Sequence, residues 1–433
     1  MINICFSRND GLSGLQWFFF IFCNTVVIPP TLKSVFHLSP EETYLIAQYS
    51  FLGAAAACIA QVCFGHRRAI MEGPGGLWWA TILSVTYAES SQGTPLGDIA
   101  MSFCIGIAIA GAMTILIGLT GFGRVLSGFF TPPVMVVFMF LLGAQLVSIF
   151  FKGMLGIPFG LANEATTIHW HTVPVAFLTV MLIVSGIVFL PQRFARYAVL
   201  VGVVAGWLIF SLLYGAEEAL PTDVSWRLFI PHGDFHLRSG IIFICVLLGI
   251  VNASNTFGAL RGTDNLYTDR PERGDIYRRS FITTGFFTLL FAPLGTVPFS
   301  PFVSSIGLLT QTGDSSRRSF LIGSILFLIV ALTPDLIRFF NAIPLPVSSA
   351  AMMVSYLPLL WSSFYFLSQT SLNPRNIYRI ALPIFSGLFL IALPSAYLQN
   401  VPLLIRPLLG NGLLMGIIMV LVLERLVPWE RVK

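Results

Sequence analysis

Charged residues are scarce in this sequence. Only 10% of the 433 residues are Asp, Glu, Lys or Arg, whereas 56% are hydrophobic. A soluble globular protein carries roughly 25% charged residues, and no soluble core could hide this much apolar surface. Each helix that crosses a bilayer needs about 20 predominantly apolar residues. The composition therefore excludes a soluble protein and predicts an all-α polytopic membrane protein whose main partner is the lipid bilayer.

Patterns typical of metal sites, enzymes and nucleic-acid binding are also missing. The six cysteines mostly lie inside apolar runs, without CxxC or His/Cys ligand spacing, and so indicate free thiols. There is no HExxH motif, no nucleophile elbow and no pair of carboxylates. The chain also lacks a basic patch or a charged tail. We therefore expect no enzymatic activity, no metal, no other cofactor and no nucleic-acid partner.

Long apolar runs are what the sequence does have. Breaks at Pro, Gly and charged residues divide them into about fourteen candidate spans. The spans lie near residues 13–33, 43–64, 69–88, 98–122, 126–151, 172–191, 197–215, 239–260, 280–295, 297–313, 319–337, 341–367, 377–396 and 402–424. Gly and Pro interrupt two of them, the third and the tenth.

The positive charges of the loops test this division. With fourteen spans, one side of the membrane holds 18 of the 24 Lys and Arg residues and the other side holds six. Cytoplasmic loops carry an excess of Lys and Arg. The bias therefore predicts that both termini are cytoplasmic, in a multi-pass protein of a bacterial inner membrane.

Fourteen spans divide into two halves of seven. Because seven is odd, related halves must have opposite orientations in the membrane. Inverted repeats are common in secondary transporters, and Gly- or Pro-interrupted segments at matching places in the two halves indicate their substrate site. Span three contains "EGPGGLWWATIL", and span ten, seven spans later, contains "VPFSPFVSSIGLLTQTG". The sequence thus predicts two inverted 7-segment repeats with interrupted spans 3 and 10.

Broken helices of this kind expose useful backbone groups. Pro removes a backbone donor and Gly weakens a helix, and broken backbone at membrane depth is tolerated only inside protein or beside a cavity. The helix N-terminus created by the break offers unpaired N–H groups to carbonyl oxygens or ring nitrogens of a ligand. A plain proline kink that serves packing is the alternative for either segment.

Polar side chains within the spans supply further candidates, because such groups face the protein interior by default. Span eight contains Asn252, Asn255 and Thr256, and an amide offers a donor and an acceptor to a planar heterocycle. Span one contains Gln16 and Asn24. Ser and Thr often only bond their own helix or join helices together, so that alternative stays open for Thr256 and for Ser304 and Ser305 of span ten.

Three stretches resemble the nucleobase–ascorbate transporter family over nearly the whole chain. "LSGLQWFFFIFCNTVVIPPTL" resembles that family's first span, with Trp17 where His is usual after Leu-Gln, and "EGPGGLWW" looks most like the purine-type bacterial branch. "SSIGLLTQTG" resembles the span-ten motif, [Gln/Glu]-Asn-x-Gly followed five residues on by Thr; Gly307 and Thr312 match it, and Ser304 and Ser305 replace its first two residues.

The resemblance implies a core domain of spans one to four and eight to eleven, and a gate domain of the remaining spans. The corresponding ranges are 1–122 and 239–338 for the core, and 123–238 and 339–433 for the gate. Members of the family import purines, pyrimidines or related compounds, commonly with protons or sodium. The resemblance thus implies a secondary transporter that imports a nucleobase of purine type, working by alternating access with proton coupling, and a homodimer formed through the gate domain.

The chain departs from the family pattern at its acidic residues. Family members usually hold substrate and proton with acidic groups in spans eight and ten, and this chain has no Asp or Glu in either. Glu72, in span three, is the replacement that we predict: it would bind a proton with the substrate and release it on the cytoplasmic side, or hydrogen-bond the purine directly. Pairing of Glu72 with Arg67 or Arg68 near the cytoplasmic interface is the alternative.

Taken together, the predicted substrate-binding residues are Glu72, Gly76, Asn252, Asn255, Thr256, Ser304, Ser305 and Ile306. Three other interpretations stay open at this point. The chain could be an uncoupled facilitator of a purine catabolite, or an anion carrier of the same seven-plus-seven fold, although an anion site favours Arg or Lys beside the half-helix N-termini. A channel or scaffold would not require the paired broken spans.

Overall fold

The computed structural model describes residues 8–157, 168–195, 197–215, 236–267, 273–371, 373–393, 395–398, 400–402, 405–427 and 429. In these residues almost all regular structure is helical. Seven helical segments are long and apolar enough to cross a membrane: Asp10–Lys33, Pro40–Cys63, Leu96–Thr120, Pro132–Met154, Ser239–Gly262, Leu345–Ser368 and Pro374–Ala392. Val173–Phe189 and Val201–Tyr214 are shorter apolar helices. The all-α polytopic class is thereby confirmed, whereas the count of fourteen spans stays a prediction.

The first half of the chain forms ten helices and one strand in its described residues. In chain order they are α1 (Arg8–Val26), α2 (Ile28–Phe36), α3 (Pro40–Cys63), β1 (Glu72–Pro74), α4 (Gly76–Ser90), α5 (Leu96–Thr120), α6 (Gly123–Ser127), α7 (Pro132–Met154), α8 (Val173–Phe189), α9 (Gln192–Ala195) and α10 (Ala198–Tyr214).

The second half forms a similar series. Its elements are α11 (Ser239–Gly262), η1 (Asp264–Leu266), α12 (Arg273–Phe291), η2 (Ala292–Leu294), β2 (Phe299–Pro301), α13 (Ser305–Thr312), α14 (Arg317–Leu332), α15 (Pro334–Asn341), α16 (Leu345–Tyr356), α17 (Pro358–Ser368), α18 (Pro374–Ala392), η3 (Ser395–Leu398), α19 (Arg406–Leu409) and α20 (Gly412–Leu426).

Local sequence explains several of these boundaries. Ser39 caps α3 in a capping box with Glu42, because each side chain accepts a hydrogen bond from the other residue's backbone N–H. α5 ends at Gly121, whose φ of 71° suits a residue without a Cβ. Pro358 divides α16 from α17, since proline disrupts a helix interior.

The two Gly- and Pro-rich segments each form a strand followed by a helix. β1 pairs antiparallel with β2, with Glu72 opposite Pro301 and Pro74 opposite Phe299. Gly75 N continues the pairing by donating to Pro298 O at 2.8 Å. α4 and α13 then begin directly beyond the strands. The segments are therefore not continuous helices, as their Pro and Gly content predicts; their membrane crossing as interrupted spans stays a prediction.

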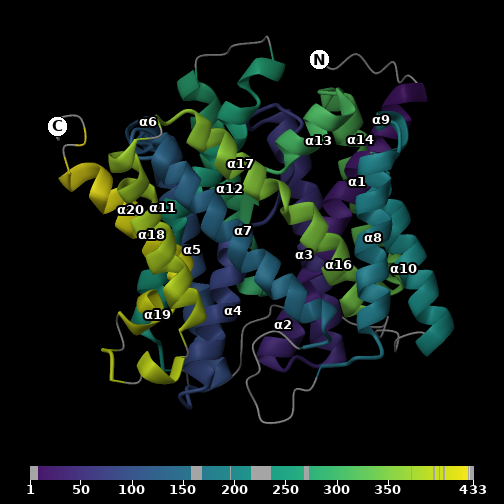
Figure 1. Ribbon diagram of the computed structural model, residues 1–433, viewed down its shortest axis with the longest axis horizontal. Coiled ribbons are helices and arrows are strands. Elements are labelled where there is room, and N and C mark those ends of the chain that lie inside the picture. Colours follow the sequence, from purple (N-terminus) through teal and green to yellow (C-terminus); the bar gives the residue numbers. More distant parts are fainter. Residues whose placement is uncertain are drawn as a thin grey trace.

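The helices pack in two groups, each built from both halves of the sequence. In the first helix group, α5 packs against α11 and α12, α14 packs against α1 and α3, and β1 lies against α3. In the second helix group, α7 packs against α16, α17, α18 and α20, and α8 packs against α10 and α16. Figure 1 shows α18 and α20 at one side of the molecule and α8 and α10 at the other, with α7 between them. α4 joins the first group through α2, α5 and α11.

The first helix group takes its helices from residues 1–122 and 239–338, and the second from residues 123–238 and 339–433. Their division into two domains that move against each other stays a prediction. α1 begins and α20 ends on the same side of the molecule, the upper side in Figure 1. Large apolar side chains lie exposed on the outer helices, including Phe189, Leu212 and Phe385. A surface of this kind suits a lipid environment.

Candidate functional site

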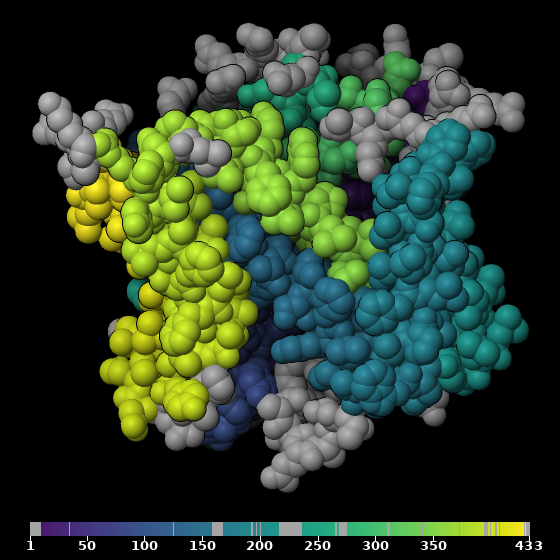
Figure 2. Space-filling view, in the orientation of Figure 1, coloured from purple at the N-terminus to yellow at the C-terminus, as the bar shows by residue number. Residues whose placement is uncertain are grey.

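A cavity of about 380 Å³ lies between the two helix groups, within the size range of small-molecule pockets. In Figure 2 purple atoms of the N-terminal segment are visible in the recess between the green surface of α16–α17 and the teal surface of α8. The residues that line the cavity come from α1, the start of α13, the α8–α10 region and α16–α17: Gln16, Phe19, Phe20, Cys23, Asn24, Ile187, Ala195, Tyr197, Val199, Val303, Ser304, Ile306, Gly307, Leu308, Val354, Ser355, Pro358, Leu359, Trp361 and Ser362.

The described lining is polar in places. None of the described residues that line the cavity is Asp, Glu, Lys, Arg or His. Amide and hydroxyl groups come from Gln16, Asn24 and three serines, and aromatic rings come from α1, Tyr197 and Trp361. Such a wall offers donors, acceptors and flat apolar faces. It therefore suits a neutral, planar ligand better than an ion.

Two amides on α1 differ in how they are satisfied. Asn24 Nδ2 donates to Phe20 O at 2.7 Å, within the helix. Gln16 is only 5% exposed, and its Nε2 has no hydrogen-bond partner among the described residues. The neighbouring Trp17 packs edge-on against Phe320 with ring centroids 4.8 Å apart, which holds this turn of α1 against α14. The amide of Gln16 is thus the unsatisfied polar group of the cavity wall.

Of the predicted residues in span ten, Ser304 and Ile306 line this cavity. Ser304 is the N-cap residue of α13. Ser305, the next residue, is fully buried and its Oγ accepts a hydrogen bond from Met71 N at 3.1 Å. The structure therefore brings Ser304 and Ile306 to the cavity wall and uses Ser305 to hold the segment before β1.

None of the predicted residues of α11 is among the residues that line the cavity, and one of them, Asn252, contacts β2. Asn252 Nδ2 donates to Phe299 O at 3.3 Å, and Asn255 Nδ2 donates to Asn252 Oδ1 at 3.0 Å. Asn252, Asn255 and Thr256 are all buried. A strand of three residues has few backbone partners, so these amides fix β2 beside α11. Their predicted contact with substrate stays a prediction.

Gly76 marks the first turn of α4 and lies close to the second helix group. A Cβ at this position would come 2.9 Å from Leu146 Cδ1 and 4.0 Å from Tyr356 Cε1. Glycine therefore permits a close approach of α4 to α7. Gly76 is not among the residues that line the cavity.

Glu72 is fully buried, and its carboxyl group points towards α3 and α12, not into the cavity. Thr284 Oγ1 donates to its Oε1 at 2.7 Å, and Gln61 Nε2 donates to its Oε2 at 3.1 Å. No cation pairs with this carboxyl group in the part of the chain that the structure describes. Its predicted roles in proton coupling and substrate binding stay predictions, but its neighbours differ from those expected.

The sequence also allows Glu72 to pair with Arg67 or Arg68 of the preceding loop, and neither forms an ion pair with it in the described part of the chain. Arg68 makes other contacts. Arg68 donates to Leu260 O at 2.5 Å and pairs with Asp264 at 2.9 Å. Burial, reinforced by Arg68 and Arg317, lowers the pKa of His66 in the same loop to about 3. Its neutral ring accepts a hydrogen bond at Nδ1 from Arg68 N, 3.1 Å away. The pairing of Glu72 with Arg68 is therefore wrong, because Arg68 ties this loop to the end of α11.

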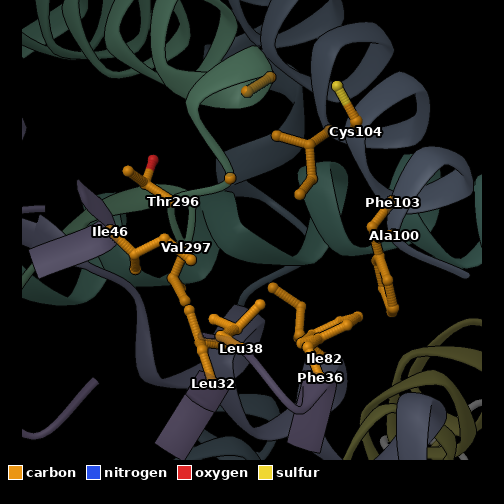
Figure 3. Close-up of a pocket in the computed structure, with 13 residues that line it drawn as sticks. Leu32, Phe36, Leu38, Ile46, Ile82, Ala100, Phe103, Cys104, Thr296 and Val297 are labelled. Carbon is orange, nitrogen blue, oxygen red and sulfur yellow. The ribbon is translucent and has the colours of Figure 1, made fainter. Parts of the chain in front are cut away.

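Two other cavities differ from the first in size or position. One holds about 530 Å³ and lies within the first helix group, where α5 and α6 meet α11 and α12 beside Arg261, Asp275 and Arg278. The other, in Figure 3, holds about 50 Å³, too little for a small-molecule pocket. Its wall, which is mostly apolar, consists of Leu32, Phe36, Leu38, Ile46, Ile82, Ala100, Phe103, Cys104, Ile107, Ala292, Gly295, Thr296 and Val297. Of these three cavities, the 380 Å³ cavity is the one whose described lining comes from both helix groups.

Several lining residues lie outside the predicted site. Gln16 and Asn24 carried a signal in the sequence, since they are amides inside an apolar span. No sequence pattern singles out Tyr197, Ser355 or Trp361 as candidate site residues, because they come from segments assigned to the gate by resemblance alone. The position of such residues depends on how the two helix groups pack against each other, and no local sequence pattern predicts that packing.

Comparison with known proteins gives this geometry a context. A family model described as "Permease family", Xan_ur_permease, matches residues 10–396. The Bacillus subtilis protein YwdJ, named as a candidate purine permease, is 25% identical over 98% of this chain and 97% of its own length. The uric acid transporter UacT of Escherichia coli is 21% identical over 95% of this chain and 84% of its own. The xanthine permease of Bacillus subtilis is 22% identical over 93% and 90%.

Solved structures share the fold at low sequence identity. The transmembrane domain of a cyanobacterial bicarbonate transporter, BicA, superimposes with a TM-score of 0.56 at 16% identity and covers 96% of this chain and 98% of its own. The anion transporter SLC26A9 gives a TM-score of 0.61 at 12% identity over 97% of this chain and 66% of its own. These likenesses show the architecture of two inverted repeats. Because the family model covers most of its length, the chain belongs to this permease family, the nucleobase–ascorbate transporters.

Proposed function

We propose that this protein is a secondary transporter that imports a nucleobase of purine type by alternating access. The observation that carries the proposal is the cavity of about 380 Å³ between the two helix groups, whose described wall has amides, hydroxyls and aromatic rings but no charged side chain. Purine bases such as adenine, guanine and hypoxanthine are planar, neutral near pH 7 and rich in donors and acceptors. The names of the relatives, which include uric acid, xanthine and nucleobase transporters, support the same class of substrate.

The position of the cavity supports alternating access. Its lining combines α1 and α13 of the first helix group with α8, α16 and α17 of the second. Movement of one group against the other would therefore change the shape and the access of the cavity. Sites near the midplane, between repeats, are typical of secondary transporters. The first helix group acts as the core in this proposal and the second as the gate.

The described lining favours a neutral base over the anion carrier. An anion carrier would place Arg or Lys beside the bound ion, and none of the described residues that line the cavity is cationic. Bicarbonate and anion transporters share the fold, but this does not favour an anionic substrate here, because the substrate of a transporter depends on its binding site and not on its fold.

We further propose that Glu72 couples uptake to protons, since it is the carboxyl group placed in the paired strands. The protein would lie in a bacterial inner membrane with both termini cytoplasmic, which the distribution of Lys and Arg supports. A homodimer through the second helix group is part of the same proposal.

Uptake of radiolabelled purines into cells lacking their own permeases, with and without a protonophore, tests the function. We expect saturable uptake of one base that the protonophore abolishes. Gly307 lines the cavity with open space beside it, so Gly307→Phe should block uptake by filling the site. Gly11, which also has open space but lies outside the cavity, provides the matched control Gly11→Phe.

Each other outcome has a defined meaning. Saturable uptake that survives the protonophore would make the protein a facilitator without coupling. No uptake of any base, together with uptake of an anion, would overturn the proposed substrate class. If Gly307→Phe and Gly11→Phe lose uptake to the same extent, the cavity is not the substrate site.

A further inference from the structure

The carboxyl group of Glu72 lies in a polar cluster that is separate from the cavity. This cluster, here called the carboxyl cluster, consists of Glu72 of β1, Gln61 of α3, and Thr284 and Ser280 of α12. All four residues are fully or almost fully buried. None of them lines the 380 Å³ cavity. The cluster is therefore separate from the described wall of the cavity.

Gln61 is held firmly within the carboxyl cluster. Besides its bond to Glu72, Nε2 lies 3.1 Å from Thr284 Oγ1 and 3.3 Å from Ser280 O. Its Oε1 accepts a hydrogen bond from His66 N at 3.3 Å. A Cβ on Gly65 would come 2.0 Å from that Oε1, so a glycine at position 65 leaves room for this conformation. These contacts orient the amide of Gln61 so that its Nε2 donates to Glu72.

Few titratable groups accompany Glu72. α3 faces it with Cys58, whose Sγ donates to Glu72 O at 3.1 Å and accepts from Glu72 N at 3.3 Å. α12 faces it with the hydroxyl group of Thr284, while Ser280 joins the cluster through its carbonyl oxygen, which accepts from Gln61; β2 contributes Pro301 opposite Glu72. α1, which also packs against β1, has its titratable Cys23 on the cavity wall. The described surroundings thus contain no charge that would balance a carboxylate, and a buried charge without a partner is costly.

The backbone connects the carboxyl cluster to the cavity in very few steps. Met71, the residue before Glu72, donates through its N–H to Ser305 Oγ at 3.1 Å. Its carbonyl oxygen accepts from Phe302 N at 2.8 Å. Ser305 begins α13, and the adjacent Ser304 and Ile306 line the cavity. A shift of β1 that follows a change at Glu72 would therefore move the wall of the cavity.

We propose that the coupling proton binds at Glu72 in the carboxyl cluster, apart from the substrate, and acts on the cavity through β1 and the first turn of α13. Gln61 and Thr284 are the positioning residues of this proton site. The substrate never touches the carboxyl group. This inference rests on the proposed function, which supplies both the transported base and the driving proton.

The test uses full-length protein in liposomes with an imposed pH gradient, and follows uptake and equilibrium binding of the transported base. Glu72→Gln should abolish accumulation driven by the gradient and remove the pH dependence of binding, while the Kd at the optimal pH changes less than about threefold. Thr284→Val removes a donor to the carboxylate, which favours the protonated carboxyl, so half-maximal uptake should move to higher pH.

Thr283 provides a matched control, because its Oγ1 donates only to its own helix, at Arg279 O, 2.9 Å away. Thr283→Val should leave the pH profile unchanged. Gly307→Phe should lose binding at every pH, which marks the behaviour of a cavity residue.

Three results would overturn the inference while leaving the proposed import of a base intact. The first is uptake by wild-type protein that does not depend on the pH gradient. The second is loss of binding in Glu72→Gln as complete as in Gly307→Phe, which would indicate direct contact with the base. The third is an equal pH shift in Thr283→Val and Thr284→Val. Absence of any base uptake by wild-type protein would instead reject the proposed function.

Discussion

A buried ion pair joins the end of α4 to the segment that leads into α20. Arg406 Nε donates to Glu89 Oε1 at 2.9 Å, and Arg406 Nη2 bonds the second carboxylate oxygen. The side chains are only 8% and 3% exposed. Thr94 Oγ1 also donates to Glu89, at 3.4 Å. Because α4 packs in the first helix group and α20 in the second, this pair ties the two groups together.

Removal of Arg406 alone should be strongly destabilising. Breaking a buried pair on one side leaves an uncompensated charge and costs about 3–5 kcal/mol. Replacement of both partners avoids that charge and is often close to neutral. We therefore expect Arg406→Met to lower the melting temperature in detergent most, and Glu89→Gln combined with Arg406→Met to recover much of the loss.

The exposed pair Arg279–Asp275 supplies the control for this double-mutant cycle. Its side chains are 37% and 55% exposed, and exposed pairs contribute about 0–1 kcal/mol. Arg279→Met should therefore leave the melting temperature almost unchanged. Additive losses in the Glu89/Arg406 double variant, with no coupling, would refute the reasoning, because they would mean that the two charges do not depend on each other.

Three further predictions concern the cavity and its support. Cys23 lines the cavity, so a small thiol reagent that modifies it should block uptake, and bound base should slow the modification. The Cys23→Ser variant should keep its uptake in the presence of the reagent. If the reagent also blocks uptake by this variant, another thiol is responsible. Gln16→Leu should weaken binding of the base up to about tenfold, because the base loses the amide of Gln16 as a partner and a hydrogen bond contributes about 0.5–1.5 kcal/mol net. An unchanged Kd would exclude the contact. Asn252→Ala should lower the melting temperature more than Asn255→Ala, since it removes the bond to Phe299 O as well as the bond between the two amides; equal shifts would contradict this.

The fold was largely predictable because it depends on composition and on Pro and Gly. Apolar runs long enough for helices appear as helices in the structure. The stretches around Gly73–Gly75 and Pro298–Pro301 could not continue as helices, and they pair as β1 and β2. The strand pairing itself was not predicted, since strands of three residues carry no periodic signal. The assembly into two helix groups followed from the resemblance and not from any local pattern.

The site was predicted less well because residue type does not reveal the direction of a side chain. Ser304 and Ser305 are adjacent and chemically alike, yet one lines the cavity and the other accepts a bond from Met71 N. The side chains of consecutive residues at a helix start point about 100° apart. A group that one of the two side chains contacts is therefore out of reach of the other. The same limit applies to Glu72, whose carboxyl group the strand directs towards α3 and α12.

Because these neighbouring residues make different contacts, a change at Glu72 can be transmitted through the backbone to the cavity wall. Ser304 touches the space for the substrate, Ser305 holds the backbone of Met71, and Glu72 follows Met71 directly in the chain. If the carboxyl group had pointed into the cavity, proton and substrate would compete for the same donors and acceptors. Because the carboxyl group lies outside the described cavity wall, a neutral base there would avoid the cost of lying beside this buried carboxylate. In the proposed mechanism, coupling through the backbone would let a site without Asp or Glu among its described lining residues respond to protons.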